Sequence, residues 1–496
     1  EEDSHDHARY GTKIDLKFAA KKDGTILGAK MDLIADTGAH NIQPYSFLGV
    51  CAGWLVSLYR IPAVRYRGTA VYTNSTPSCA MRGFGSPQVT FPVESLIDEL
   101  AHELDMDPVD LRLKNYVGLG DTFWGQGPLV RSIVQSDGNP ELLERGKEAI
   151  GWGERLPSGS QDGRYRRGMG MARGFHTSSA GAPQPGDVID FSGAMVKVNT
   201  DGSVDVITAL MDHGGGTHEA VAKLVAEALH VPLNKVDLAP AETRSTVYDV
   251  CTHATRGVYV GGGAAVKAAE TVRQEIIETA AQFMDVMPGA LRLKLDRDRG
   301  QSMIYAPSIP ERTMSLAELA TRCWAESRKT IAAVESYRAT DCPPAYVTVF
   351  LDLEIDTWTG QVETKRAVMG SDCGTVINPH LAAGQLEGGL SMGAGYALYE
   401  EIRWDRKGHL LSGGYWIDAK TPSIGESPLV GDLTIHFAHT HEPTGPFGAK
   451  GIGEAAMNPV AAAYANAIYN AIGVRFYDLP ITAEKILKAL EGESHD

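Results

Sequence analysis

Four segments of the sequence place glycines next to side chains that could bind an anion or move a proton. They are MRGFGSPQ at 81–88, DHGGGTHE at 212–219, RGVYVGGG at 256–263 and GAKGIGE at 448–454. Each stands ahead of a stretch with helical periodicity, and backbone N–H groups at a helix N-terminus bind phosphates and carboxylates. One glycine turn before a helix is common in proteins, so the occurrence of four together is the informative observation.

The carboxylate of Glu454, at the end of GAKGIGE, is the candidate general base. A glycine turn that carries a carboxylate into a buried pocket removes its solvation. We expect this to raise the pKa of Glu454 toward the range in which proton transfer is effective near neutral pH. The alternative role for Glu454 is a charge at a helix N-terminus, stabilised by the helix dipole.

The same segments exclude standard nucleotide-binding motifs, because none contains G-x-G-x-x-G in a βαβ setting or G-x-x-x-x-G-K-[ST]. The cysteines are scattered and form no C-x-x-C pair, which disfavours zinc sites, iron–sulfur clusters and a disulfide framework. A reduced, cytoplasmic protein is the interpretation that follows. The six cysteines are Cys51, Cys79, Cys251, Cys323, Cys342 and Cys373.

The elements that must position these residues are both strands and helices, which predicts an α+β fold with mixed sheets. Alternating apolar and polar residues on both sides of a turn predict three hairpins. These span 12–39, 193–210 and 346–368. Helical periodicity predicts five helices, the second with Asp107 as its N-cap. These span 88–104, 108–116, 217–229, 262–283 and 459–472.

The chain is too long for one ordinary domain, at 496 residues. A zone rich in glycine and proline over 118–126, followed by another over 151–170, is the best candidate for a domain junction. We therefore divide the chain near residue 150, into domains over 1–150 and 151–496. The formal net charge of −16 and the lack of a basic cluster argue against nucleic acid as a partner. The sequence contains no run of about 18 apolar residues, so it predicts no membrane span.

The order of the segments resembles the xanthine dehydrogenase and aldehyde oxidase family of molybdenum hydroxylases. The resemblance rests on MRGFGSPQ, DHGGGTHE and GAKGIGE, on DCGTVINPHLAAGQLEGGLSMGAGYALYEE at 372–401, and on the ending YDLPITAEKILKAL. It implies a large two-domain molybdenum subunit with a pterin cofactor buried between the domains. Residues 1–150 would be the remainder of the first molybdopterin-binding domain, and residues 151–496 would be the second, with the catalytic glutamate. The pterin dithiolene, and no protein side chain, would hold the molybdenum.

The resemblance also assigns roles to single residues. Glu454 matches the family's catalytic base, which takes a proton from the water that attacks an electrophilic carbon. Five residues are expected at the substrate pocket: Phe84, Arg82, Ala254, Thr255 and His176. Twelve are expected to hold the cofactor: Met81, Arg82, Gly214, Gly215, Gly216, Thr217, Arg256, Gly257, Val258, Gln385, Gly451 and Gly453. The alternatives are a core phenylalanine, a surface arginine, a structural histidine and a capped glutamine.

Three departures from the family pattern bear on substrate and partners. Val50 stands where xanthine-oxidising members carry an arginine, and Gly215 stands where many relatives have a glutamine. The family's first stretch of this subunit is absent, and EEDSHDHARYG looks like the point where it would join. We expect partners: a subunit or fragment that supplies this stretch, a 2Fe–2S subunit and an FAD subunit, together in a dimer of hetero-oligomers.

The RGFG sequence with Phe84 favours hydroxylation of an N-heteroaromatic ring, such as nicotinate or a purine, with water as the oxygen source and electrons passing to the iron–sulfur and flavin partners. The expected cofactor is molybdenum-molybdopterin in its cytosine dinucleotide form. An aldehyde oxidoreductase is the enzymatic alternative. Two non-enzymatic alternatives are a cofactor-binding scaffold subunit and a binding protein for acidic metabolites that contains no metal.

Overall fold

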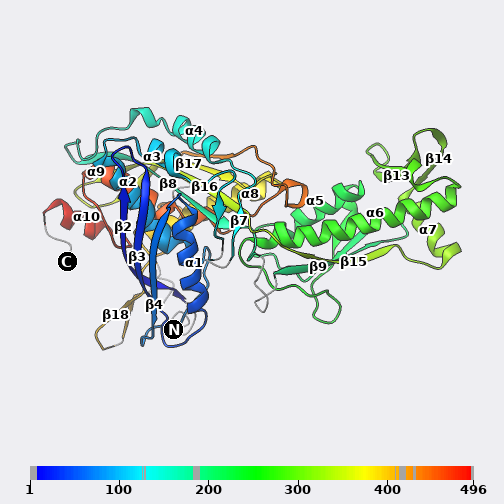
Figure 1. The fold of residues 1–496 in the computed structure, drawn as a ribbon, viewed down its shortest axis with the longest axis horizontal. Coiled ribbons are helices and arrows are strands. Elements are labelled where there is room, and N and C mark those ends of the chain that lie inside the picture. The colour runs from blue at the N-terminus through cyan, green and yellow to red at the C-terminus, as the bar shows by residue number, and fades with distance from the viewer. Residues whose placement is uncertain are drawn as a thin grey trace.

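The computed structural model describes residues 8–125, 127, 130–181, 190–407, 409–412, 420–427 and 432–492. Two lobes are visible in Figure 1: a larger lobe, and an elongated lobe built from residues 191–338 that extends from it. The elongated lobe begins after β8 (Tyr165–Thr177) and returns before β16 (Pro344–Asp356). These two strands pair antiparallel in the larger lobe, with Thr177 opposite Pro344, so both connections to the elongated lobe lie side by side.

The larger lobe is built on a sheet of four strands in the order β20-β17-β16-β8. β16 pairs antiparallel with β8 and with β17 (Val362–Asp372), and β17 pairs parallel with β20 (Asp432–Phe437). β16 is buried on both faces, which explains its nearly continuous apolar sequence. Phe350 packs with α4 (Asn139–Ile150), whereas its neighbours Val349 and Leu351 pack with α9 (Val460–Ile472), because successive side chains of a strand point to opposite faces.

Glycines of β8 allow α9 to lie close against the sheet. A Cβ atom at Gly170 would lie 2.1 Å from the backbone nitrogen of Ala467, and one at Gly168 would lie 2.2 Å from its carbonyl oxygen. The expectation that residues 151–170 form a domain junction is therefore wrong over its last residues, which are part of a core strand. Their glycines serve helix–strand packing and do not mark a linker.

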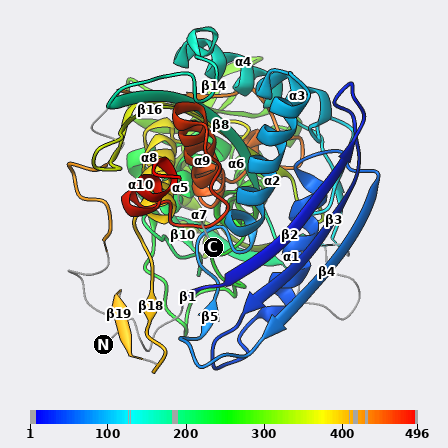
Figure 2. The same ribbon diagram turned by 90° about the vertical axis from the view of Figure 1, so that its left-hand side faces the viewer.

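A second sheet of the larger lobe contains β2 (Gly11–Ala20), β3 (Ile26–Asp36) and β4 (Ala63–Val71), and it lies beside α2 (Ser86–Glu103) in Figure 2. β2 and β3 form the first predicted hairpin, whereas β4 joins β3 in parallel through α1 (Pro44–Ser57). The remaining elements of this lobe are β1 (Ala8–Arg9), β5 (Ser78–Cys79), α3 (Pro108–Asn115), β6 (Thr122–Phe123), β7 (Ser132–Ile133), α8 (Pro379–Leu398), β18 (Arg403–Trp404), β19 (Leu410–Ser412) and α10 (Ala483–Leu490).

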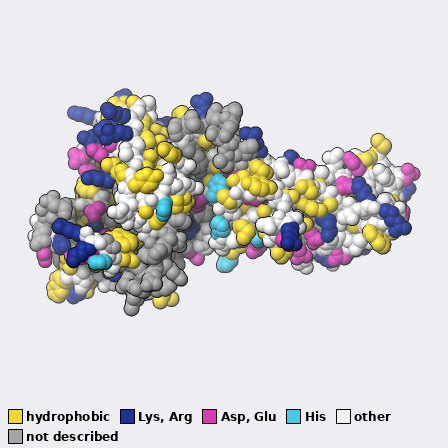
Figure 3. Space-filling model, turned by 90° about the horizontal axis from the view of Figure 1, so that it is seen from below, with side chains coloured by type: hydrophobic (Ala, Val, Ile, Leu, Met, Phe, Trp, Pro, Cys, Tyr) yellow, Lys and Arg dark blue, Asp and Glu magenta, His cyan; other side chains and the backbone are white. Residues whose placement is uncertain are grey.

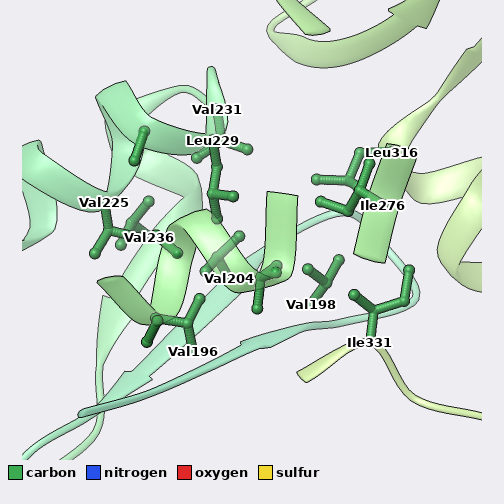
Figure 4. Packing of buried hydrophobic residues seen from close by; sticks show 14 of the residues in the cluster. Val196, Val198, Val204, Val225, Leu229, Val231, Val236, Ile276, Leu316 and Ile331 are labelled. Atoms are coloured by element: carbon green, nitrogen blue, oxygen red, sulfur yellow. The ribbon is translucent and has the colours of Figure 1, made fainter. Parts of the chain in front are cut away.

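The elongated lobe has its own sheet, in the order β11-β10-β9-β15, with α5 and α6 packed against it. Its core contains no residue from outside the lobe, and Figure 4 shows Val196, Val204, Leu229 and Ile276 within it. A three-stranded sheet and α7 form the far end of the lobe (Figure 1). The elements are β9 (Phe191–Val198), β10 (Val204–Ile207), α5 (Thr217–Leu229), β11 (Val236–Leu238), α6 (Gly262–Met284), β12 (Arg292–Asp296), β13 (Gln301–Ala306), β14 (Ile309–Ser315), α7 (Leu316–Ser327) and β15 (Ala332–Arg338).

The α+β class, the three hairpins and the five helices are confirmed, with helix ends that shift by at most two residues. Asp107 caps α3, because its side chain accepts a hydrogen bond of 2.7 Å from the amide of Val109. The division near residue 150 stays a prediction, and the visible narrowing of the molecule lies instead at the two ends of the segment 191–338. No helix in the described part of the chain is long and apolar enough to cross a bilayer.

Candidate active site

The side chain of Glu454 lies where three of the four glycine segments meet. It follows the glycine turn of GAKGIGE and leads into a 3-10 turn, Ala455–Met457, ahead of α9. The Gly83 amide of MRGFGSPQ donates to Oε2 at 2.9 Å, and the Thr255 amide, just before RGVYVGGG, donates to Oε1 at 3.0 Å. The anion expected at the start of α2 is therefore the protein's own carboxylate.

His176, at the end of β8, is the nearest ionisable side chain to Glu454. Its Nε2 lies 3.3 Å from Glu454 Oε2, and the two side chains are 2% and 20% exposed. Its Nδ1 lies 3.1 Å from the hydroxyl of Thr255. Residues predicted only to line a pocket are thus in direct contact with the candidate base.

The pKa of Glu454 moves in the opposite direction to the sequence expectation. Burial raises it, but the charge of His176, the amides of Gly83 and Thr255, and the charge of His253 lower it more, so the net shift is downward. The prediction of a raised pKa is therefore wrong. Burial was foreseen from the glycine turn, but the partners that stabilise the ionised form come from distant segments.

The turn that carries Thr255 has an unusual backbone. Ala254 and Thr255 have φ angles of 47° and 55°, in the left-handed region that side-chain-bearing residues seldom adopt. Such conformations cost free energy and cluster at functional sites. Gly451 packs against this turn, since a Cβ atom there would lie 2.3 Å from Thr255 Cγ2 and 2.4 Å from its carbonyl oxygen. The GAKGIGE turn and the 254–255 turn therefore fit only without a side chain at position 451.

Arg82, Gln385, Gly453 and Gly215 form a second contact group beside Glu454. The Arg82 side chain donates to the carbonyl oxygens of Gly453 at 2.7 Å and Gln385 at 3.0 Å. A Cβ atom at Gly453 or at Gly215 would lie 3.5 Å from the Gln385 side-chain amide. Gln385 comes from α8, so this group joins the 372–401 motif to three glycine segments.

The glycine loop at 214–216 is held by Asp212, which the sequence did not single out. Asp212 Oδ1 accepts hydrogen bonds from the amides of Gly214 at 2.9 Å and Gly216 at 3.1 Å. These two amides are thereby engaged within the loop, which corrects the expectation that they would point at a ligand. An aspartate two residues before a glycine is a known turn signal, and it could have indicated this role.

Arg256 is fully buried, and its guanidinium is committed to the protein. It pairs with Asp190 at 2.6 Å and Asp249 at 2.8 Å, and it donates to the hydroxyl of Ser192 at 2.7 Å. Any contact of Arg256 with a cofactor would therefore involve its backbone. The π-helical turn Gly257–Gly261, which includes Val258, follows, and a Cβ atom at Gly257 would lie 2.9 Å from Thr217 Cγ2. The 212–217 and 254–258 segments are thus in direct contact.

Phe84 lies in an aromatic cluster at the edge of the site. Its ring packs edge-on against Phe47 at 5.6 Å and Tyr10 at 6.2 Å between centroids, and it stays partly exposed. Val50 is buried nearby, because a Cβ atom at Gly85 would lie 3.2 Å from it. The position where xanthine-oxidising relatives would have a cation is therefore apolar and adjacent to the Phe84 segment.

Arg9 is a further residue of the site, and it lies outside the four glycine segments. Its Nη2 donates to the carbonyl oxygen of Arg82 at 2.9 Å and lies against the sulfur atoms of Met81 and Met457 at 2.6 and 3.3 Å. Its Nη1 is buried without a hydrogen-bond partner among the described residues.

Histidine side chains gather where the two lobes meet, on the face of the molecule that Figure 3 shows.

Lys450 of GAKGIGE pairs with Asp372 at 2.8 Å, and both side chains are fully buried. The pair joins two motifs that are far apart in the sequence, because Asp372 opens the 372–401 segment. A buried lysine inside a glycine-rich turn needs a carboxylate, and opposite charges in two motifs were the available signal.

A separate cavity of about 530 Å³ lies between α1 and β4. Gly53, Val56, Tyr66 and Trp124 line it, and none of the predicted site residues does. The site at Glu454 is therefore defined by its contacts and not by that cavity.

The donor set of the Glu454 site suits a polar organic cofactor better than a directly bound ion. Within the described residues, no group of three or more His, Cys, Asp or Glu side chains is placed to hold a metal. A buried arginine nitrogen without a partner among the described residues and the Gln385 amide are instead suited to hydrogen-bonding groups of a ligand. The residues present therefore fit a pterin whose own atoms carry the metal.

Comparison with known proteins agrees with this geometry. Residues 145–428 match the family model of a molybdopterin cofactor-binding domain, and residues 2–116 match a second model of that description. The xanthine dehydrogenase molybdenum-binding subunit of Escherichia coli O157:H7 is 32% identical over 482 residues, which cover 96% of this chain and 62% of that protein. The nicotine 6-hydroxylase large subunit of Paenarthrobacter nicotinovorans is 28% identical, covering 99% of this chain and 60% of that protein. The chain thus spans about three fifths of the length of these relatives.

Solved structures of the same architecture align over nearly the whole chain. Quinoline 2-oxidoreductase from Pseudomonas putida 86 aligns with a TM-score of 0.89 at 24% identity, over 99% of this chain and 63% of that chain. Aldehyde oxidoreductase from Desulfovibrio desulfuricans aligns with a TM-score of 0.79 at 27% identity, over 97% of this chain and 49% of that chain.

Proposed function

The chain belongs to the xanthine dehydrogenase family of molybdopterin cofactor-binding proteins, and on this premise we propose that it is the catalytic molybdenum-cofactor subunit of a hydroxylase, or a part of that subunit. The observation that carries the proposal is the Glu454 carboxylate, enclosed by the segments that carry the family resemblance and held by the amides of Gly83 and Thr255. A scaffold subunit would have no use for a carboxylate oriented in this way.

The cofactor would lie against backbone of the 81–82, 214–217, 256–258 and 451–453 segments and against the Gln385 side chain. When bound, it would supply a metal that acidifies water and accepts the electrons of the oxidation. Glu454 takes up the proton released from that water, acting as the general base. The two amides fix the direction of its carboxylate, so the proton acceptor is already oriented when a substrate enters.

The apolar edge of the site supports a proposal for the substrate class. Phe84 is partly exposed, and Val50 is buried beside its segment, so this edge suits a flat and largely apolar ring. We propose an N-heteroaromatic substrate of the nicotinate or purine kind, oxidised at a ring carbon next to nitrogen. The nicotine and quinoline enzymes among the similar proteins support this choice. An aldehyde is the second candidate, supported by the similarity to the aldehyde oxidoreductase from Desulfovibrio desulfuricans.

The electrons need acceptors, and we propose 2Fe–2S and FAD groups on partner subunits, with a partner segment that supplies the rest of the molybdenum domain. The nicotine 6-hydroxylase relative is named a large subunit, which supports a multi-subunit enzyme. We further propose the cytosine dinucleotide form of the cofactor, a dimer of hetero-oligomers and a cytoplasmic setting, for which the six unpaired thiols are suitable.

Replacement of Glu454 by glutamine tests the proposal in the enzyme purified with its native partners. E454Q should lower kcat with a heteroaromatic substrate roughly 100-fold to 10,000-fold, the usual contribution of a general base, and should keep its molybdenum. E484Q, on the exposed helix α10, is the matched control and should leave kcat unchanged. Unchanged turnover of E454Q with full molybdenum content would favour the scaffold role, and absence of molybdenum from the wild type would exclude both.

A further inference from the structure

Both ring nitrogens of His176 face polar atoms in a nearly sealed environment. Nδ1 lies 3.2 Å from the carbonyl oxygen of Thr177 and 3.1 Å from the hydroxyl of Thr255. Nε2 lies 3.3 Å from Glu454 Oε2, and the His176 side chain is 2% exposed. The ring also packs edge-on against Trp54, with centroids 5.2 Å apart, which fixes its orientation.

The partners of His176 determine where its hydrogens lie. The hydroxyl of Thr255 can donate or accept, so Nδ1 either donates to the carbonyl oxygen of Thr177 or accepts from Thr255. An ionised carboxylate only accepts, so a ring with its hydrogen on Nδ1 alone would set a lone pair of Nε2 against Glu454 Oε2. A hydrogen on Nε2 turns this repulsion into a charge-assisted hydrogen bond. The arrangement therefore favours a ring whose Nε2–H donates to the carboxylate.

The hydrogen bonds of Glu454 leave one acceptor position open. An ionised carboxylate has about four lone-pair sites. The amide of Gly83 and the ring of His176 take the two sites of Oε2, and the amide of Thr255 takes one site of Oε1. The second site of Oε1 is the one that the described residues leave available.

We propose that His176 is a positioning residue for Glu454: its Nε2–H holds Oε2 and favours the ionised carboxylate, so that Oε1 accepts the proton of the attacking water. This inference rests on the proposed function, because it assigns a partner to the general base. In the step, one water O–H bond breaks and an O–H bond forms on Oε1, while the N–H bonds of His176 stay intact. His253, Arg9 and Arg82 are the other charged or titratable groups that act on Glu454, and none has a nitrogen within 4.0 Å of its carboxylate in the described part of the chain.

The charge and the hydrogen bond of His176 can be separated by substitution. H176Q keeps an N–H donor for Oε2 but cannot carry a charge. The acid limb of the kcat–pH profile reports protonation of the base, and loss of the neighbouring cation should shift it upward by about one pH unit or more. H436Q, which replaces another buried histidine on β20 packed against Gly370, is the matched control and should leave the limb in place. An unmoved limb in H176Q, or an equal shift in H436Q, would overturn the proposal.

Infrared difference spectroscopy of the complete enzyme gives a readout that does not depend on turnover. The carboxyl band that E454Q removes reports Glu454, and H176Q should raise the pH at which this band appears. E454Q should also shift the ring bands of His176, because it removes the carboxylate that Nε2–H faces, a test that does not need H176Q to fold. If both bands respond as expected while E454Q keeps full activity, only the proposed function fails. If E454Q is inactive and the bands do not respond, only the role of His176 fails.

Discussion

At position 451 the backbone leaves no space for a side chain. The methyl group of alanine would meet the Thr255 side chain and carbonyl oxygen at 2.3 and 2.4 Å. Because the Thr255 amide holds Glu454 Oε1, the strain would reach the candidate base directly.

We therefore expect Gly451→Ala to lower kcat roughly 100-fold, the usual result of a misplacement of about 1 Å. It should lower the free energy of unfolding by only about 1–3 kcal/mol, which is typical of overpacking. Steady-state kinetics and chemical denaturation measure the two effects. Gly153→Ala, where a Cβ atom meets nothing within 4 Å, is the control that should change neither. Wild-type kinetics in Gly451→Ala would mean that Thr255 does not position the base.

Among the elements, β16 ends at Asp356, which forms an ion pair with Arg164, the residue just before β8. Arg164 donates to both oxygens of Asp356, at 2.9 and 2.7 Å. The hydrogen bonds from Arg164 are the largest cause that lowers the pKa of Asp356 from 3.8 to about 2. A carboxylate whose pKa is lowered in the folded state stabilises the fold above its ordinary pKa, and this contribution is lost as the pH falls from about 3.8 to about 2.

Asp356→Asn removes this proton-linked contribution. The free energy of unfolding of the variant should therefore fall less steeply than that of the wild type between pH 4 and pH 2, as measured by urea denaturation at several pH values. Asp432→Asn, an exposed position at the start of β20 on the same sheet, is the matched control and should follow the wild-type slope. Equal slopes for Asp356→Asn and the wild type would show that the pair does not respond to pH.

The elements that could be predicted from the sequence are those with a clear local period. The hairpins around Asp23-Gly24 and Asp201-Gly202 and helix α5 are of this kind, because their turn residues and apolar spacing act locally. β8 was missed because its glycines are explained by contact with Ala467, almost 300 residues later in the chain. α8 was missed because it is rich in glycine and has little amphipathic contrast.

The site could be predicted as a set of segments but not as a set of contacts. Glu454, His176 and Thr255 were all selected, whereas the ring-to-carboxylate contact and the amide of Gly83 are long-range facts of the fold. Arg9 was missed because no spacing around it indicates a site. The ion pairs of the Arg256 side chain were not foreseen, because neither Asp190 nor Asp249 belongs to one of the four glycine segments.

For the whole molecule, the two lobes have separate hydrophobic cores. The core of the elongated lobe is drawn entirely from residues 191–338, and the main cores of the larger lobe contain none of them. Tyr259 and Tyr337 connect the lobes through hydrogen bonds to Thr444 at 2.7 and 3.2 Å. These hydrogen bonds, like that from Thr255 to Glu454, are polar contacts between two cores that do not merge, so the lobes should lose structure in separate steps.

Ile276→Ala should remove about 2–5 kcal/mol from the elongated lobe alone, because it leaves a cavity in that core. Hydrogen exchange read by mass spectrometry in mild denaturant should become faster over 191–338 and stay unchanged over β16 and α9. Ile468→Ala, which removes a buried side chain of α9 from the core of the larger lobe, is the reciprocal variant and should give the opposite pattern. Faster exchange over the whole chain in both variants would mean that the lobes unfold as one unit.

The hydrogen bond from Thr255 to Glu454 crosses between these lobes, and this has a mechanical consequence. The ends of β8 and β16 lie side by side where the lobes join, and a tilt of the elongated lobe would pivot there. From this junction α6, with its 23 residues, extends along the elongated lobe for roughly 34 Å. A tilt about the pivot that moves the tip by several ångströms changes the Thr255–Glu454 separation by only a fraction of that distance. A binding partner at the tip of the elongated lobe would therefore restrain the distance between Thr255 and the candidate base.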